Sequence, residues 1–181
     1  SLHALHLHAV RAWLPGFLLV VLAAGGGENP SAKAATVAGL AMLIGSAGPV
    51  AGGFLSGRFG RPDSATAILA LGGACAFLVG WTADLPWALI VALATVYGWA
   101  VSADSAIYQT GVTEASPHPE LGSSMAMASS LGVLGGIVGP IIFGATLDLA
   151  PEQQQWGLSF STLGLVALAA ILAMLRLRKL F

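Results

Sequence analysis

Long apolar stretches and short polar segments alternate along this chain. Six stretches hold about 20 mainly apolar residues, the length that a helix needs to cross the hydrocarbon core of a bilayer. The segments between them, such as GGGENPSAK at 25–33, carry glycine, proline and charge, which is typical of loops. The pattern predicts an all-α integral membrane protein, a single six-helix membrane domain over 1–181, with spans at about 4–24, 34–56, 65–81, 87–111, 122–147 and 156–175.

Composition agrees with this interpretation and excludes other classes of protein. Of the 181 residues, 56% are hydrophobic and only 8% are charged, whereas charged residues make up roughly a quarter of a typical soluble domain. Seven Lys and Arg against eight Asp and Glu leave the chain nearly neutral, which argues against nucleic-acid binding. The single cysteine, Cys75, supplies neither a disulfide framework nor a thiolate metal site. We expect a lipid bilayer around the protein, and we expect no cofactor.

The basic residues predict an orientation. With six spans, both ends of the chain and the connections after the second and fourth spans lie on one side of the membrane, and the other three connections lie on the opposite side. Lys33 is the one basic residue, Lys or Arg, of those three connections. Because Lys and Arg accumulate in short cytoplasmic segments, we expect both ends of the chain and the arginine loop after the second span in the cytoplasm. The side with the chain ends holds Arg58, Arg61, Arg176, Arg178 and Lys179.

Glycines four residues apart indicate close helix packing in the second and fifth spans. In lipid, helices approach closely where small residues line the contact. Plain helix contact without movement is the simpler explanation of any one pair. Pro49 and Pro140 each follow a glycine inside a span, and we expect bends there. The paired positions are Gly48 with Gly52, Gly53 with Gly57, Gly132 with Gly136, and Gly135 with Gly139.

The stretch GFLSGRFGRP at 53–62 resembles the loop motif of the major facilitator superfamily. Gly57 stands where that family commonly has Asp, so this copy is similar to the weaker one, which lies between the eighth and ninth helices. The missing carboxylate puts a charge-locking role of the loop in doubt, and anchoring at the cytoplasmic face explains the arginines as well. The positions that match the motif are Gly53, Leu55, Ser56, Arg58, Gly60 and Arg61.

Two further stretches extend the resemblance over the whole chain. GVLGGIVGPIIFGATLD at 132–148 is similar to the glycine-rich eleventh helix of many members, and RAWLPGFL at 11–18 is similar to the seventh helix of some bacterial branches. The resemblance implies helices seven to twelve, which form a 3+3 inverted repeat and half of a twelve-helix transporter. It also implies an N-terminal six-helix half as partner, a small-molecule substrate and a place in the cell membrane, here the bacterial inner membrane. We therefore expect a fragment of a longer chain.

Two ionisable residues fall inside predicted spans. Arg11 lies in the first span, two residues before Trp13, and Asp104 lies in the fourth. Because an ionisable group is costly inside a membrane, each is a candidate for the substrate or proton pathway. We expect Arg11 and Asp104 to face each other or to face cavity water. A pair that only neutralises its own charges has the same sequence pattern.

Polar residues continue along the fourth span. Ser105, Tyr108 and Gln109 share one helical stripe by their spacing of three and four, and they indicate either a cavity lining or an interhelical hydrogen-bond seam. His3, His6 and His8 stand near the start of the chain and do not share one clean face. We interpret them as solvated at the membrane interface, and we expect no metal site.

The function that this pattern favours is secondary active transport of a small solute by alternating access, coupled to protons. A channel would need a repeated polar face in several spans, and only the fourth span is clearly polar. A channel or a structural membrane subunit remains the alternative. An intramembrane enzyme is disfavoured because no HExxH and no Gly-x-Ser-x-Gly pattern occurs within the spans.

Overall fold

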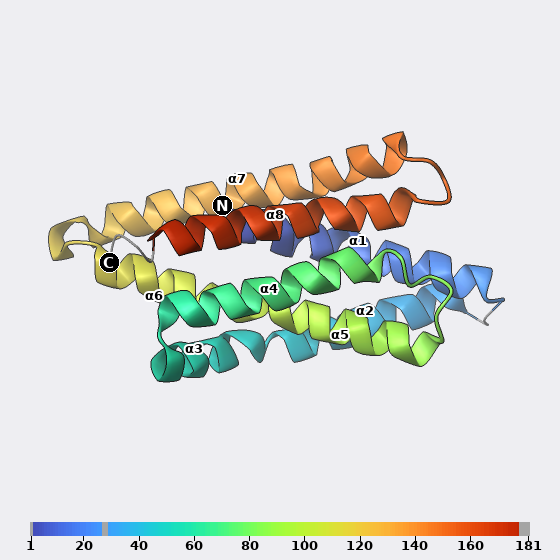
Figure 1. The fold of residues 1–181 in the computed structure, drawn as a ribbon, viewed down its shortest axis with the longest axis horizontal. Helices are drawn as coiled ribbons and strands as arrows, with labels where there is room; N and C mark the ends of the chain where they lie inside the picture. Colours follow the sequence, from blue (N-terminus) through green and yellow to red (C-terminus); the bar gives the residue numbers. More distant parts are fainter. Residues whose placement is uncertain (1, 27–28, 178–181) are drawn as a thin grey trace.

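The computed structural model of the protein describes residues 2–26 and 29–177, and these residues form helices connected by short loops (Figure 1). No strand occurs within those two ranges. The helices follow the chain in the order α1 (Leu2–Ala24), α2 (Pro30–Gly45), α3 (Gly48–Phe59), α4 (Arg61–Val79), α5 (Trp87–Ala103), α6 (Ser105–Ala115), the 3₁₀ turn η1 (His118–Glu120), α7 (Leu121–Leu149) and α8 (Gln155–Leu177).

Six helical segments of the described chain are long and apolar enough to cross a membrane, which confirms the all-α, multi-pass prediction. Two of these segments are interrupted. The second consists of α2 and α3, which separate just before Pro49, so the expected bend there is present as a break. The fourth consists of α5 and α6, which separate at Asp104. The helix α7 continues through Pro140 without a break.

The helix contacts have the symmetry of two exchanged triplets. The most extensive contacts join α4 with α8, α1 with α7, and α2 with α5. The first, second and third spans correspond to the fourth, fifth and sixth. The α1–α7 contact therefore corresponds to the α5–α2 contact, and the α4–α8 contact corresponds to itself. Figure 1 places the α3–α4 and α6–α7 connections at one end of the bundle, and the α4–α5 and α7–α8 connections at the other.

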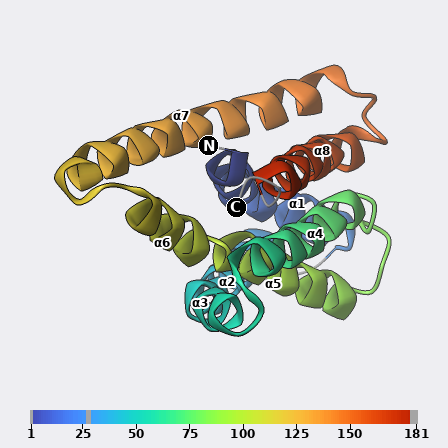
Figure 2. The ribbon, with the colours of Figure 1, turned by 60° about the vertical axis from the view of Figure 1, so that its left-hand side comes forward.

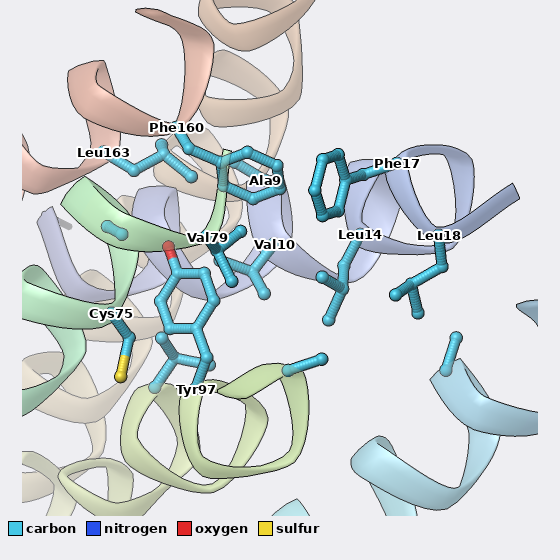
Figure 3. Close-up of a cluster of buried hydrophobic side chains, with 14 of the residues drawn as sticks. Ala9, Val10, Leu14, Phe17, Leu18, Cys75, Val79, Tyr97, Phe160 and Leu163 are labelled. Carbon is cyan, nitrogen blue, oxygen red and sulfur yellow. The ribbon is translucent and has the colours of Figure 1, made fainter. Parts of the chain in front are cut away.

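The main core lies where α1 meets α5 and α8 (Figure 3). Val10, Leu14 and Phe17 of α1 are fully or almost fully buried, and they share a cluster with Tyr97 of α5 and Phe160 of α8. In lipid such a cluster gains little from the hydrophobic effect. It is stabilised mainly by close van der Waals contact between complementary surfaces.

Glycine permits the closest helix contacts. A Cβ atom added at Gly52 would lie 1.8 Å from the carbonyl oxygen of Ala103, and one at Gly48 would lie 2.9 Å from that of Trp99. In α7, a Cβ at Gly139 would lie 2.2 Å from the carbonyl oxygen of Leu5. Any side chain at these positions would therefore push two backbones apart.

The remaining paired glycines differ in their surroundings. A Cβ at Gly136 would lie 2.9 Å from the ring of His8, and Gly135 is buried. At Gly53, Gly57 and Gly132 an added Cβ would meet nothing within 4 Å. The four-residue spacing thus occurs at both closed and open surfaces of the bundle.

Candidate functional site

A cavity of about 860 Å³ opens between α1, α6, α7 and α8. Its walls are the first turns of α1, the whole length of α6, the N-terminal half of α7 and the last turns of α8. In Figure 2 the N-terminal half of α7 lies away from α8, and α6 approaches α7 at the connection between them. The contacts between α6 and α7 are correspondingly few. Two smaller cavities in the described part of the chain measure only about 10 and 20 Å³.

Three of the sequence-predicted residues line this cavity together. Ser105, Tyr108 and Gln109 all contribute to its wall from α6. The helix restarts at Ser105 after the interruption at Asp104, so spacings of three and four place the three side chains on one face. The sequence left two possibilities open for this stripe, and both features are present: the three residues line a cavity, and Ser105 also makes a hydrogen-bond contact with His3 of α1.

Asp104 lies behind that wall, with only 2% of its side chain exposed. Its carboxylate oxygen Oδ1 is 2.8 Å from Nδ1 of His3, the distance of a charge pair. The contact does not count as a hydrogen bond, so Oδ1 has no hydrogen-bond partner among the described residues. The other ring nitrogen of His3 is 3.1 Å from the hydroxyl oxygen of Ser105. Since His3 also lines the large cavity, its ring links the buried carboxylate to that space.

His6 makes a second polar contact between α1 and α5. Its Nε2 is 2.7 Å from the hydroxyl oxygen of Tyr97, and both residues are buried. The expectation that the histidines are solvated at the interface is therefore wrong for His6, and the partly exposed His3 contacts Asp104. Only His8 is exposed, at the edge of the cavity. No group of three His, Cys, Asp or Glu side chains that could hold a metal ion occurs in the described ranges.

One signal in the sequence could have identified these residues. His3 and His6 are one helical turn apart in a segment whose other side chains are mostly apolar, so they share one face of α1. Tyr97 and Asp104, seven residues apart, likewise share one face of the fourth span. Two polar pairs, each on one face of an otherwise apolar helix, indicate a polar seam between the two helices.

Arg11 does not meet Asp104. Its side chain is exposed on α1, beside Ala41 of α2 and Gly98 of α5, and it forms no ion pair within the described part of the chain. The helical period gives the reason. Five residues after His6, Arg11 is rotated by about 140° from the face that contacts α5 through the histidines. The expected Arg11–Asp104 contact is therefore replaced by the His3–Asp104 contact.

Trp13 belongs to an aromatic cluster and is not part of the cavity wall. Its indole N–H donates a hydrogen bond to the carbonyl oxygen of Pro140 over 3.0 Å, and its ring stacks on Phe143 with 5.5 Å between ring centres. Trp156 and Phe160 of α8 complete the cluster. These rings fill the space between α1, α7 and α8 beyond the cavity, so the three helices are closely packed there.

The arginine loop connects two helix ends. The guanidinium of Arg61, the first residue of α4, donates two hydrogen bonds to the carboxylate of Glu114 near the end of α6. Gly60 has φ of +86° between α3 and α4, a conformation that favours glycine. Arg58 lies over the ring of Phe59, and Leu55 packs on a small core cluster of α4, α5 and α6. Gly53, also part of the motif, has open space around it.

Comparison with known protein families gives one match that covers almost the whole chain. Residues 7–180 match the family described as Major Facilitator Superfamily. No curated protein and no solved structure matches the chain.

Proposed function

The chain belongs to the major facilitator superfamily of membrane transporters, and we propose that it works by alternating access, moving a small solute in exchange for or together with protons. Its six spans would form one bundle of the transporter, which rocks against an N-terminal six-helix half around a site near the middle of the membrane. The bacterial inner membrane, with the ends of the chain and the Arg58–Arg61 loop in the cytoplasm, agrees with the distribution of basic residues.

The contact between His3 and Asp104 carries this proposal. A carboxylate that is 2% exposed inside a spanning segment is costly unless a partner compensates it. Imidazole is suited to be that partner in a proton pathway, because it gains and loses a proton near neutral pH. His3 touches both Asp104 and the cavity, so a proton that leaves the carboxylate has a direct route to the space where a solute would bind.

The unequal packing of the two ends of the bundle supports alternating access. Beyond the cavity, the cluster of Trp13, Phe143, Trp156 and Phe160 fills the space between α1, α7 and α8. Toward the α6–α7 connection the same group of helices diverges around the cavity (Figure 2). A bundle that is closed at one end and open at the other has the form of one of the two states that the mechanism requires.

Ser105, Tyr108 and Gln109 are proposed to contact the solute, and Arg11 and Trp13 keep different proposed roles. The exposed guanidinium of Arg11 is available to a solute or to the partner bundle. Trp13 would act on the pathway through the aromatic cluster that closes one end. A channel or a structural subunit has no comparable observation in its favour.

The test is proton movement driven by solutes in proteoliposomes that contain the whole transporter and a pH-sensitive dye. A panel of small solutes is added outside, and the internal pH is followed. For a transported solute, we expect Asp104→Asn to lower solute-driven proton movement at least tenfold while exchange of the solute itself continues. Asp84→Asn, in an exposed loop, is the matched control and leaves both rates unchanged. Unchanged proton movement in Asp104→Asn would show that the pair is only structural.

A further inference from the structure

The geometry of the large cavity points to the chemical class of its ligand. We propose that the cavity binds an uncharged amphiphile, with its polar end against α1 and α6 and its apolar body against α7 and α8. This inference rests on the proposed transport function, and it names the substrate class of the same site.

The charge of the cavity wall carries the first part of the argument. None of the described residues that line it is Asp, Glu, Lys or Arg. Asp104 lies behind His3, and Arg11 lies beside α2 and α5, outside the cavity. The groups of the described wall that can carry charge near neutral pH are the imidazoles of His3 and His8. While they are neutral, a ligand with a permanent charge would lose hydration on entry and would find no counter-charge, which is unfavourable. The wall therefore selects against permanent anions and permanent cations.

The distribution of polarity gives the orientation of the ligand. Hydroxyl, amide and imidazole groups are concentrated on the α1 and α6 side, where His3, Ser105, Tyr108 and Gln109 are found. The α7 and α8 side presents mainly aliphatic side chains, and Ser129 is its polar exception. A molecule with one hydrogen-bonding end and one apolar end matches both walls at once. A uniformly polar solute would leave the α7 and α8 wall in contact with its hydroxyl groups.

The size and softness of the cavity fit such a molecule. A volume of about 860 Å³ lies within the range of sites for drug-sized ligands. Met125 of α7 and Met174 of α8 have flexible, polarisable side chains, which adjust to apolar bodies of different shape.

The experiment uses two fluorescent probes with the same aromatic skeleton. N-phenyl-1-naphthylamine is uncharged, and 8-anilino-1-naphthalenesulfonate carries a sulfonate. Each is titrated into the protein in lipid nanodiscs, and energy transfer from the tryptophans reports binding above the signal of empty nanodiscs. Gly132→Leu fills the cavity from α7, where an added Cβ meets nothing within 4 Å, so the variant should fold. Gly39→Leu is the matched control, because Gly39 on α2 has equally open space outside the cavity.

We expect the uncharged probe to bind wild type and Gly39→Leu equally, and to bind Gly132→Leu at least tenfold more weakly. Ala128→Leu, one turn earlier in the same wall, should repeat this loss and guards against a folding defect in one variant. The sulfonate should show no binding that Gly132→Leu removes. Equal loss for both probes would overturn the exclusion of charge. Equal binding of the uncharged probe to all variants would overturn the site, including the case in which bilayer lipid or another part of the protein fills the cavity.

The probe titration and the transport assay distinguish a wrong ligand class from a wrong transport mechanism. If the uncharged probe binds as expected and no solute moves protons, the proposed transport mechanism fails and the ligand class stands. If solutes move protons and the probe ignores Gly132→Leu, the ligand class fails and the transport mechanism stands.

Discussion

Glycines that are paired over the same four-residue spacing have opposite surroundings at different places in this bundle. In α3, Gly48 and Gly52 press their backbone against α5, where an added Cβ would lie within 3 Å of a carbonyl oxygen. In α7, Gly132 precedes Gly136 by the same four residues, yet it faces the open cavity beside α6. The facing helix accounts for the difference. Ala103 of α5 is small and fully buried, whereas α6 presents the larger, polar side chains of Tyr108 and Gln109 to the cavity.

The α3–α5 contact belongs to the scaffold of the bundle, and the α6–α7 contact belongs to the candidate site. The α3–α5 contact is closed and made of backbone and small side chains, so it holds two spans at a fixed distance. The α6–α7 contact is open and carries the polar groups, so it is the region where a ligand can bind and where helices can move. Substitutions should therefore affect folding at the first contact and binding or transport at the second.

Gly52→Leu should have the largest effect, because it tests the closed contact directly. Its Cβ would lie 1.8 Å from the Ala103 carbonyl oxygen, and relief requires the two backbones to separate. We expect a loss of about 3 kcal/mol or more in the free energy of unfolding, or no folded protein. Gly53→Leu, the adjacent residue with open space, is the control. Unfolding by sodium dodecyl sulfate gives the stability of both variants. Equal stability of the two would show that the α3–α5 contact is not closed at Gly52.

Tyr97→Phe should have the next largest effect, since it removes a partner without changing the packing. The imidazole of His6 then stays buried without its 2.7 Å contact, which costs about 1–3 kcal/mol. His6→Leu combined with Tyr97→Phe removes both polar groups and should recover part of the loss. The same unfolding titration provides the values. His6→Leu alone completes the set. If the double variant loses more free energy of unfolding than the two single variants together, a water or another group must be a hydrogen-bond partner of these residues.

Gly132→Ala should change stability little, because it tests the open contact. The added methyl group meets nothing within 4 Å, and alanine is favoured over glycine in a helix by about 1 kcal/mol in peptides. We expect stability equal to or slightly above that of wild type, measured as the thermal midpoint in detergent. A clear loss of stability would mean that α6 and α7 close on each other in the folded protein.

Arg61→Gln should have the smallest effect. Arg61 and Glu114 are both exposed or nearly so, and an exposed ion pair is weakened by solvent and salt. We expect a thermal midpoint within error of wild type at low and high salt. A salt-dependent decrease that Glu114→Gln reproduces would show that the loop contributes to holding α4 and α6 together.

Much of the fold could be predicted from local patterns. The length of each apolar stretch determines the spans, and Pro49 marks the break between α2 and α3 because proline lacks the N–H that a helix interior needs. The break at Asp104 was not predicted. No proline or glycine stands there, and the interruption accompanies the contact of Asp104 with His3, which lies 101 positions earlier in the chain.

The candidate site could be predicted only as far as one helix determines it. The shared face of Ser105, Tyr108 and Gln109 follows from their spacing. The partner of Asp104 depends on which face of α1 meets α5, and both Arg11 and His3 were available on different faces of that helix. The sequence favoured Arg11 because it falls inside a predicted span, whereas His3 stands just before that span, near the start of the chain. The packing of Val10, Leu14 and Phe17 into the core instead turns Arg11 outward.

In the proposed mechanism, Asp104 exchanges its proton through His3 with the ligand cavity. Infrared difference spectroscopy of the protein in nanodiscs can detect this exchange. Adding N-phenyl-1-naphthylamine at constant pH should change the protonation band of one buried carboxyl group in wild type. Asp104→Asn should remove the change because the group is absent, and Gly132→Leu should remove it because the ligand no longer binds. An unchanged band in wild type on ligand binding, or the same change of the band in Asp104→Asn, would show that Asp104 does not exchange its proton with the ligand cavity.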